Sequence, residues 1–283
     1  MEKNVLQTDL TGKVAVVTGA GGVLCSYLAK VLARAGAKVA LVNRSEGAIN
    51  QYAAEIVEEG GIAKAYACNV LDKNICVAVA EQVKADLGLC DILVNGAGGN
   101  NPRATTDKEY FEIGDIDADT KSFFDLDADG VGFVFNLNFL GTLIPTQAFA
   151  AQMVGREGCS ILNISSMNAY TPLTKIPAYS GAKAAISNFT QWLAVHFSRV
   201  GIRVNAIAPG FFLTDQNYSL MYREDGTPTE RSGKIVAGTP MGRFGKPEEL
   251  LGALMFLVDE HAASFVTGVC IPVDGGFSAY SGV

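Results

Sequence analysis

Residues 13–25 read KVAVVTGAGGVLC, a short run rich in valine followed at once by a turn rich in glycine. Apolar residues then recur at helical spacing over residues 24–35, so the pattern predicts a strand, a tight turn and a helix. Glycines in such a turn let the backbone approach a pyrophosphate at the start of the helix. We therefore expect a nucleotide-binding turn at Gly19, Gly21 and Gly22, although helix–strand packing alone can also require such glycines.

The alternation of strand and helix continues along the chain. Strands are expected at 37–42, 62–67, 92–95, 160–165, 203–207 and 269–273, and helices at 46–59, 72–87, 132–153, 179–198 and 247–258. Strands that alternate with helices form a parallel sheet covered on both faces. The sequence thus predicts an α/β fold: one doubly wound, Rossmann-like domain over residues 1–283, with a seven-stranded parallel sheet.

Two segments interrupt this alternation, at residues 100–130 and 211–240. Each follows a predicted strand at its C-terminal end, and ligands bind at that edge of open parallel sheets. We expect the first segment to be an insertion beside the substrate and the second to be a substrate lid.

The composition narrows the class of protein. Hydrophobic residues make up 49% of the 283 residues and charged residues 18%, which is enough apolar material for a large core. The net charge of −7, without clustered lysine or arginine, argues against nucleic acid as a partner. No secretory signal or membrane span is visible, and the six cysteines show no metal-ligand spacing. We expect a cytoplasmic protein with no membrane partner and no metal.

The second predicted strand leads into Asn43 and Arg44. Dinucleotide folds usually place an acidic residue here for the ribose 2′-hydroxyl of NAD, whereas an arginine suits the 2′-phosphate of NADP. NADP(H) is therefore favoured. NAD(H), bound through Asn43 with Arg44 in solvent, is the alternative.

Tyr179 and Lys183 are four residues apart at the start of a predicted helix, so they share one face of it. A nearby ammonium favours ionisation of a phenol, which suits Tyr179 for acid–base catalysis. The same spacing also occurs by chance in ordinary amphipathic helices. Other positions decide between the two interpretations: Ser166 lies thirteen residues before Tyr179, and Asn138 lies in the helix predicted at 132–153.

In order and kind, these four positions resemble the catalytic set of the short-chain dehydrogenase/reductase superfamily. Thr18-Gly19, Asn69-Val70, Asn95-Gly96-Ala97-Gly98, Pro209-Gly210 with Thr214, and Val273-Asp274-Gly275-Gly276 also resemble family motifs, from about residue 12 to residue 277. Val23 and Cys25 stand where the family has glycines, and Gly96 stands where it has asparagine. We expect the cofactor to contact Gly19, Gly21, Gly22, Val23, Leu24, Asn43, Arg44, Asn69, Val70, Asn95, Gly96, Ala97, Tyr179, Lys183, Pro209, Gly210 and Thr214.

The resemblance implies a mechanism. In the reduction direction a carbonyl accepts hydride from the nicotinamide, and Tyr179 protonates its oxygen while Ser166 steadies that oxygen. Lys183 is implied to bind the nicotinamide ribose, and Asn138 to support a water that links Lys183 to solvent. The family also commonly forms tetramers through the two helices expected here at 132–153 and 179–198, so a homotetramer is expected.

The substrate is indicated by three short runs: GGNNPRATT at 98–106, GVLC at 22–25 and FDLD at 124–127. They resemble D-mannonate oxidoreductases (fructuronate reductases), which implies the interconversion of a keto sugar acid and its hydroxy acid. We expect Asn100, Asn101, Thr105 and Thr106 to bond substrate hydroxyls and Arg103 to hold the carboxylate. Asn168 and Lys175 are expected to assist, beside Ser166 and Tyr179.

Three alternatives remain. One is an enzyme like gluconate 5-dehydrogenase, or another polyol or ketose reductase. Another is a sugar-nucleotide epimerase, suggested by the spacing of Thr18-Gly19 and Gly22 but disfavoured because only about a hundred residues follow Tyr179. The third is a nucleotide sensor without enzymatic activity, disfavoured because such proteins typically lose the tyrosine or the lysine.

Overall fold

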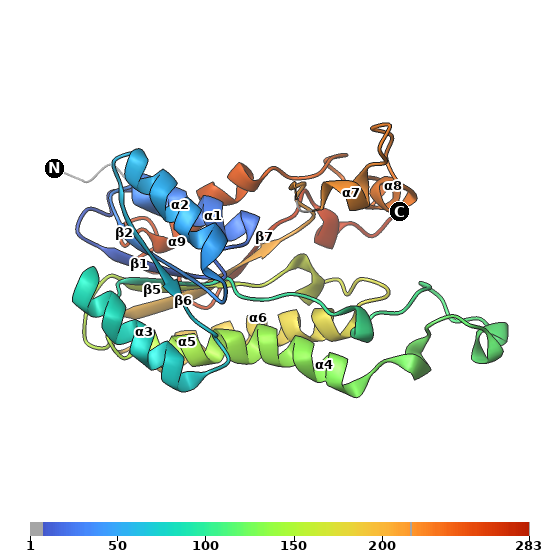
Figure 1. The fold of residues 1–283 in the computed structure, drawn as a ribbon, viewed down its shortest axis with the longest axis horizontal. Helices are drawn as coiled ribbons and strands as arrows, with labels where there is room; N and C mark the ends of the chain where they lie inside the picture. The colour runs from blue at the N-terminus through green and yellow to red at the C-terminus, as the bar shows by residue number, and fades with distance from the viewer. Residues whose placement is uncertain (1–7, 216, 283) are drawn as a thin grey trace.

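The computed structural model describes residues 8–215 and 217–282. Seven strands form one parallel sheet in the order β3-β2-β1-β4-β5-β6-β7, which confirms the predicted α/β fold (Figure 1). The strands are β1 Val14–Thr18, β2 Lys38–Asn43, β3 Ile62–Ala67, β4 Ile92–Asn95, β5 Cys159–Ile164, β6 Ile202–Pro209 and β7 Cys270–Val273. Their ends lie within two residues of the predicted ends.

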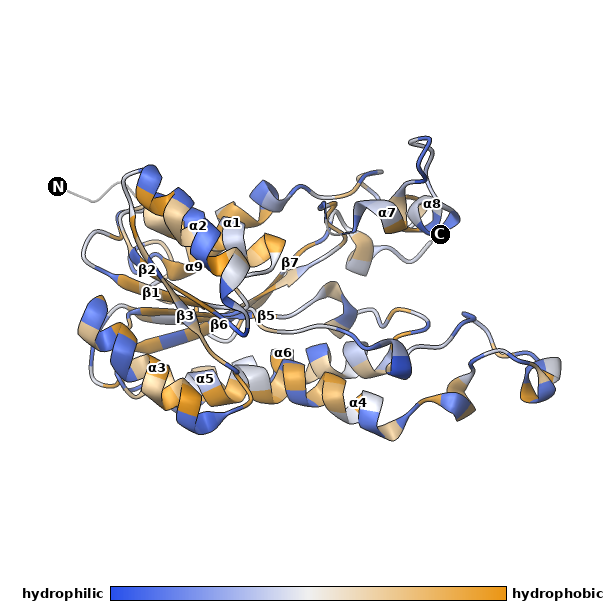
Figure 2. Cartoon of the chain, in the orientation of Figure 1, coloured by the Kyte–Doolittle hydropathy of each residue, from blue (hydrophilic) through white to orange (hydrophobic). Residues whose placement is uncertain are grey.

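Helices cover both faces of the sheet (Figure 1). One face carries α1 Val23–Arg34, α2 Glu46–Glu58 and α9 Leu251–Val258, and the other carries α3 Lys73–Asp86, α5 Gly141–Ala150 and α6 Pro177–Phe197. The alternation of side chains along β1 explains the two layers. Ala15 and Val17 are buried in the first layer, with α1, α2 and α9, and Val14 and Val16 are buried in the second layer, with α3, α5 and α6. Apolar residues accordingly concentrate along the strands and the inward helix faces (Figure 2).

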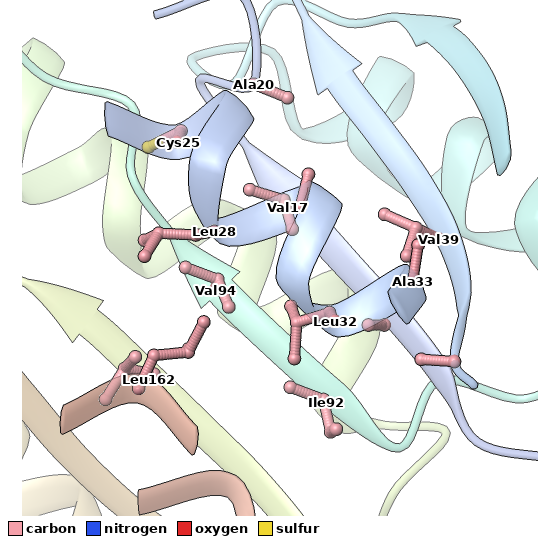
Figure 3. Close-up of a cluster of buried hydrophobic side chains, with 14 of the residues drawn as sticks. Val17, Ala20, Cys25, Leu28, Leu32, Ala33, Val39, Ile92, Val94 and Leu162 are labelled. Carbon is pink, nitrogen blue, oxygen red and sulfur yellow. The ribbon is translucent and has the colours of Figure 1, made fainter. Parts of the chain in front are cut away.

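The first layer packs α1 onto the middle of the sheet. Leu28 and Leu32 of α1 meet Val17 of β1 and Val94 of β4 in one buried cluster (Figure 3). This packing fixes the start of α1 above the carboxyl ends of β1 and β4, so the glycine turn faces the edge of the sheet at which ligands bind.

The helix predicted at 132–153 differs from the observed one. It begins as α4 Ala128–Phe135, because the Asp127 carboxylate accepts hydrogen bonds from the backbone N–H groups of Asp129 and Gly130. It then widens into a π-helical turn, η4 Asn136–Leu140, before α5. Likewise, the helix predicted at 247–258 begins as the 3₁₀ turn η6 Pro247–Leu250 and continues as α9.

The segment 100–130 extends away from the sheet, beyond the start of α4 (Figure 1). It contains the 3₁₀ turns η1 Pro102–Ala104, η2 Ile113–Asp117 and η3 Phe123–Asp125. Its base is held to the loop before α6, because the Thr106 N–H donates to the Lys175 carbonyl oxygen over 2.9 Å. Lys175 has a φ of 70°, in the left-handed region, so this loop is tightly bent.

The segment 211–240 contains two helices, α7 Tyr218–Met221 and α8 Glu230–Ala237. The 3₁₀ turns η5 Met167–Ala169 and η7 Phe277–Ala279 lie between β5 and α6 and after β7. An ion pair of 2.9 Å joins Lys234 of α8 to Glu109 of the 100–130 segment. None of the helices that the structure describes has the length and apolar character needed to cross a membrane.

Candidate active site

A cavity of about 830 Å³ opens at the carboxyl ends of the strands. Most of the predicted site residues line it: Gly19, Gly22, Val23, Leu24, Asn43, Arg44, Asn69, Val70, Gly96, Ala97, Ser166, Tyr179, Lys183, Pro209, Gly210 and Thr214. Ten predicted residues lie outside this lining: Gly21, Asn95, Asn100, Asn101, Arg103, Thr105, Thr106, Asn138, Asn168 and Lys175.

The glycine turn is shaped for close approach of a ligand. Gly19 has a φ of 66°, and a Cβ on it would come within 2.7 Å of the Ala97 nitrogen. Gly22 caps α1 without a side-chain hydrogen bond, so the first N–H groups of the helix lack a side-chain acceptor and lie at the cavity. An anionic pyrophosphate fits such a helix start. Gly21 lies beside the Asn43 side chain, where a Cβ would come within 2.6 Å of the Asn43 Nδ2 atom.

Cys25 and Gly96 are two departures from the family pattern that occupy one space. A Cβ on Gly96 would overlap the Cys25 Sγ atom. The thiol is buried, and its burial raises the pKa of Cys25 to about 11, so it remains a neutral packing group. Because the cysteine fills the space of a side chain at position 96, glycine is required there.

We predict that Gly96→Ala destabilises the protein by about 1–3 kcal/mol through overpacking. Cys25→Ala in the same chain should recover part of that loss, because it removes the overlapping sulfur. Urea unfolding of both single variants and the double variant measures the coupling. Gly114→Ala is the control, since an added Cβ meets no atom within 4 Å there. Strictly additive effects at positions 25 and 96 would contradict the shared-space explanation.

The outer end of the cavity is formed after β2 and β3. Asn43, Arg44, Asn69 and Val70 line it. The Arg44 side chain is exposed, and within the ranges 8–215 and 217–282 it has no ion pair. Asn95 turns away from this end: its Nδ2 donates to Thr146 Oγ1 and Asn163 Oδ1, each over 2.9 Å. Its role in this arrangement is to tie β4 to the neighbouring helix and strand.

Tyr179, Ser166 and Lys183 meet at the centre of the cavity. Lys183 Nζ lies 5.6 Å from the centre of the Tyr179 ring and donates to the Ile164 carbonyl oxygen over 2.8 Å. Burial raises the pKa of Tyr179 to about 12, against a hydrogen bond to Ser166 that lowers it, and burial lowers the pKa of Lys183 to about 8. Desolvation thus outweighs the expected effect of the ammonium on the phenol, and Tyr179 is a protonated donor at neutral pH.

Asn138 lies one layer behind the cavity, in the π-helical turn. Its Nδ2 donates to the carbonyl oxygens of Gly99 and Val134, each over 2.8 Å, and its Oδ1 accepts from the Gly99 N–H over 3.3 Å. A Cβ on Gly98 would come within 2.5 Å of Asn138 Oδ1 and 3.2 Å of Lys183 Nζ. Asn138 and Lys183 therefore both lie on the side of Gly98 where a side chain would project.

The predicted substrate residues of the 100–130 segment bond mainly within that segment. Asn100 donates to Thr105, and the Arg103 guanidinium pairs with Asp127, leaving 61% of the Arg103 side chain exposed. Asn168 is buried, and its Oδ1 has no hydrogen-bond partner among the described residues.

Sequence reasoning missed several cavity residues: Phe133, Leu137, Leu220, Met221, Arg231 and Phe244. Arg231 is the notable one, because it brings a cation from α8 to the cavity. In the sequence, Arg231 is a charged residue in a short amphipathic helix of the predicted lid, and no motif around it indicates a binding site. Thr214 was predicted, and its N–H donates to the Asn217 Oδ1 atom over 2.9 Å.

The parallel sheet, the glycine turn and the meeting of Ser166, Tyr179 and Lys183 define a nicotinamide-dependent oxidoreductase site. The model of the short chain dehydrogenase family matches residues 13–224, and the chain belongs to that family. It is an oxidoreductase of that class.

Three relatives illustrate the similarity. A solved Haemophilus influenzae structure with bound NAD, provisionally called a D-mannonate oxidoreductase, is 60% identical, with a TM-score of 0.94 over 99% of each chain. A Bacillus subtilis protein, "Uncharacterized oxidoreductase UxuB", is 52% identical over 98% of this chain and 99% of its own. A gluconate 5-dehydrogenase from Burkholderia cenocepacia, solved with NADP and tartrate, is 30% identical, with a TM-score of 0.82 over 98% of this chain and 99% of its own.

Proposed function

We propose that the protein interconverts a keto sugar acid and the corresponding hydroxy acid, of the D-fructuronate and D-mannonate type. One observation carries the proposal: among the described residues that line the cavity, three are cationic (Arg44, Lys183 and Arg231) and none is aspartate or glutamate. A protein with a net charge of −7 thus has a cationic cavity, which favours anionic ligands. The Haemophilus relative and the gluconate dehydrogenase support a sugar acid as the substrate.

The proposed reaction uses the residues at the centre of the cavity. A bound nicotinamide dinucleotide supplies the hydride to the carbonyl carbon. The Tyr179 hydroxyl donates its proton to the carbonyl oxygen, and the Ser166 hydroxyl donates a hydrogen bond to the same oxygen. Lys183 holds a positive charge beside Tyr179 and would contact the nicotinamide ribose of a bound cofactor. Asn138 positions the backbone at Gly98 and Gly99 next to Lys183.

We predict that NAD(P)H oxidation is faster with fructuronate or 5-ketogluconate than with a neutral ketose or an acetoacetyl thioester. The kcat/KM difference should be at least about 10-fold, the effect of one charge-assisted hydrogen bond. Measurement of kcat/KM for all four substrates tests the proposal. Preference for the ketose or the thioester over both acids would overturn it in favour of a neutral ketose reductase, and NADPH binding without oxidation would indicate a sensor.

We propose that the cofactor is NADP(H) with a modest advantage over NAD(H), because Arg44 is exposed beside Asn43 at the outer end of the cavity. Arg44→Ala should lower kcat/KM about 10-fold with NADPH and leave NADH nearly unchanged. Arg34→Ala, which removes an arginine paired with Glu59 on the surface, is the control. An equal loss with both cofactors would show that Arg44 does not recognise the 2′-phosphate.

We also propose a cytoplasmic homotetramer. The thiols of all six cysteines are free, as expected in a reducing compartment. An apolar groove between α5 and α6 is lined by Leu143, Phe189 and Trp192, and 56% of Trp192 is exposed. Such a face suits association with another copy. Sedimentation of a monomer alone at micromolar concentration would contradict this assembly.

A further inference from the structure

The three cations of the cavity differ in how strongly they are already engaged. Lys183 is buried and bonded to Ile164 beside Tyr179, and Arg44 lies at the outer end, after β2. Arg231 is exposed, and among residues 8–215 and 217–282 its side chain has neither an ion pair nor a hydrogen bond. Arg231 is therefore the cation that is available to a ligand other than the adenosine part of a dinucleotide.

Helix α8 turns Arg231 toward the 100–130 segment. Arg231 and Lys234 are three residues apart and so are neighbours on the helix surface, and the buried Ser232 and Ile235 lie on the other flank of Arg231. Lys234 reaches Glu109 of the 100–130 segment over 2.9 Å. This ion pair joins the 211–240 segment to the insertion. The face of α8 that carries Arg231 is thus directed to the insertion side of the cavity, where Phe133 and Leu137 form its wall.

Arg103, the arginine that the sequence suggested for the carboxylate, is placed differently. It lies outside the cavity lining, and its guanidinium pairs with Asp127 and approaches Asp129 at 3.9 Å. A guanidinium held by carboxylates of its own segment must leave them before it can bind a ligand. Arg231 meets no such competition from the described residues.

We propose that Arg231 is the residue that holds the carboxylate of the substrate, through paired N–H donors of its guanidinium. Glu109 and Lys234 are positioning residues, which hold α8 so that Arg231 faces the substrate. The proposal rests on the proposed function, because it requires an acid as the substrate. The other anion that a free guanidinium could hold in this cavity is the pyrophosphate of the cofactor.

The test compares Arg231→Gln and Arg231→Lys with Arg103→Gln. For each variant, KM and kcat are measured with 5-ketogluconate and with fructose, and the Kd for NADPH is measured by fluorescence titration. Arg231→Gln should raise KM for 5-ketogluconate about 10- to 100-fold and change KM for fructose less than about 2-fold. Arg231→Lys should give an intermediate KM, because it keeps the charge and loses the planar pair of donors. Arg103→Gln should resemble the wild type.

Five outcomes overturn the proposal. An equal loss with both substrates would give Arg231 a structural role. A higher Kd for NADPH with an unchanged preference for the acid would assign it to the pyrophosphate. A loss specific to the acid in Arg103→Gln and not in Arg231→Gln would restore Arg103. A wild type without preference for the acid would remove the proposed function together with this inference, whereas a preference that survives in Arg231→Gln removes this inference alone.

The positioning role has its own readout. Glu109→Gln breaks the ion pair to Lys234 and leaves Arg231 intact, so KM for 5-ketogluconate should rise less than in Arg231→Gln, with kcat and the Kd for NADPH unchanged. Glu112→Gln is the control, because Glu112 pairs with Lys108 inside the same segment. If Glu109→Gln and Glu112→Gln behave alike, the contact between α8 and the insertion does not orient Arg231.

Discussion

Tyr179→Phe is expected to lower kcat for carbonyl reduction by between about 10²- and 10⁴-fold, the usual contribution of a positioned general acid. The phenol has the proton to give, because burial raises its pKa to about 12, and the hydroxyl lies in the cavity with Ser166. Phenylalanine removes only the donor, so the Kd for NAD(P)H should stay within about 2-fold. Steady-state rates and fluorescence titration measure the two effects.

Tyr170→Phe is the matched control. The Tyr170 hydroxyl donates to the Cys270 carbonyl oxygen over 2.7 Å and lies outside the cavity lining. Its loss should leave kcat nearly unchanged. If Tyr179→Phe retained most of its kcat, or lost no more than Tyr170→Phe, the proposed mechanism would be falsified.

Lys183→Ala is expected to lower kcat and weaken cofactor binding together, with a loss in kcat/KM of at least about 10²-fold. The wild type adds a pH dependence. Because burial lowers the pKa of Lys183 to about 8, its ammonium is present below that pH and is lost as the pH rises through it. The kcat/KM for reduction, which reports the free enzyme, should therefore fall above pH about 8, while Tyr179 is still protonated.

Lys183→Arg separates charge from shape. Arginine stays protonated throughout this range, so whatever activity the variant keeps should lose the decline near pH 8. Lys30→Ala, in a half-buried pair of Lys30 on α1 with Glu55 on α2, is the control for removing an ammonium elsewhere. A pH profile of Lys183→Arg that matches the wild type would assign the decline to another group.

Most of the fold could be predicted because its strands carry a strong local signal. The valines of β1 are buried on both faces of the sheet, and such central strands appear as continuous apolar runs. The start of α4 was less visible, since Gly130 and Gly132 weaken the helical pattern there. The signal that the prediction did not use is Asp127, a capping side chain five residues before the predicted start.

The site divides in the same way. Ser166, Tyr179 and Lys183 follow from fixed spacings on a strand end and a helix, and the structure brings them into one cavity. The placement of Arg103 and Arg231 depends on which carboxylate each can reach across the fold. Asp127 pairs with Arg103. Glu109 pairs with Lys234, so Arg231 remains exposed. Such competition between distant side chains leaves no periodic pattern in a sequence.

The π-helical turn at Asn136–Leu140 sets the phase between the two halves of one long helix. Each residue of an α-helix advances the chain by about 100° around the helix axis. The π-helical turn contains one residue more than an α-helical turn, so α4 is rotated by about that angle relative to α5. Val134 can thereby pack against Ala178 and Ala182, while Phe149 is buried in the layer that joins α3, α5 and α6 to the sheet. The number of residues in this turn is therefore constrained, whatever their types. Removing any single residue from the turn would swing α4 and the attached insertion away from the start of α6.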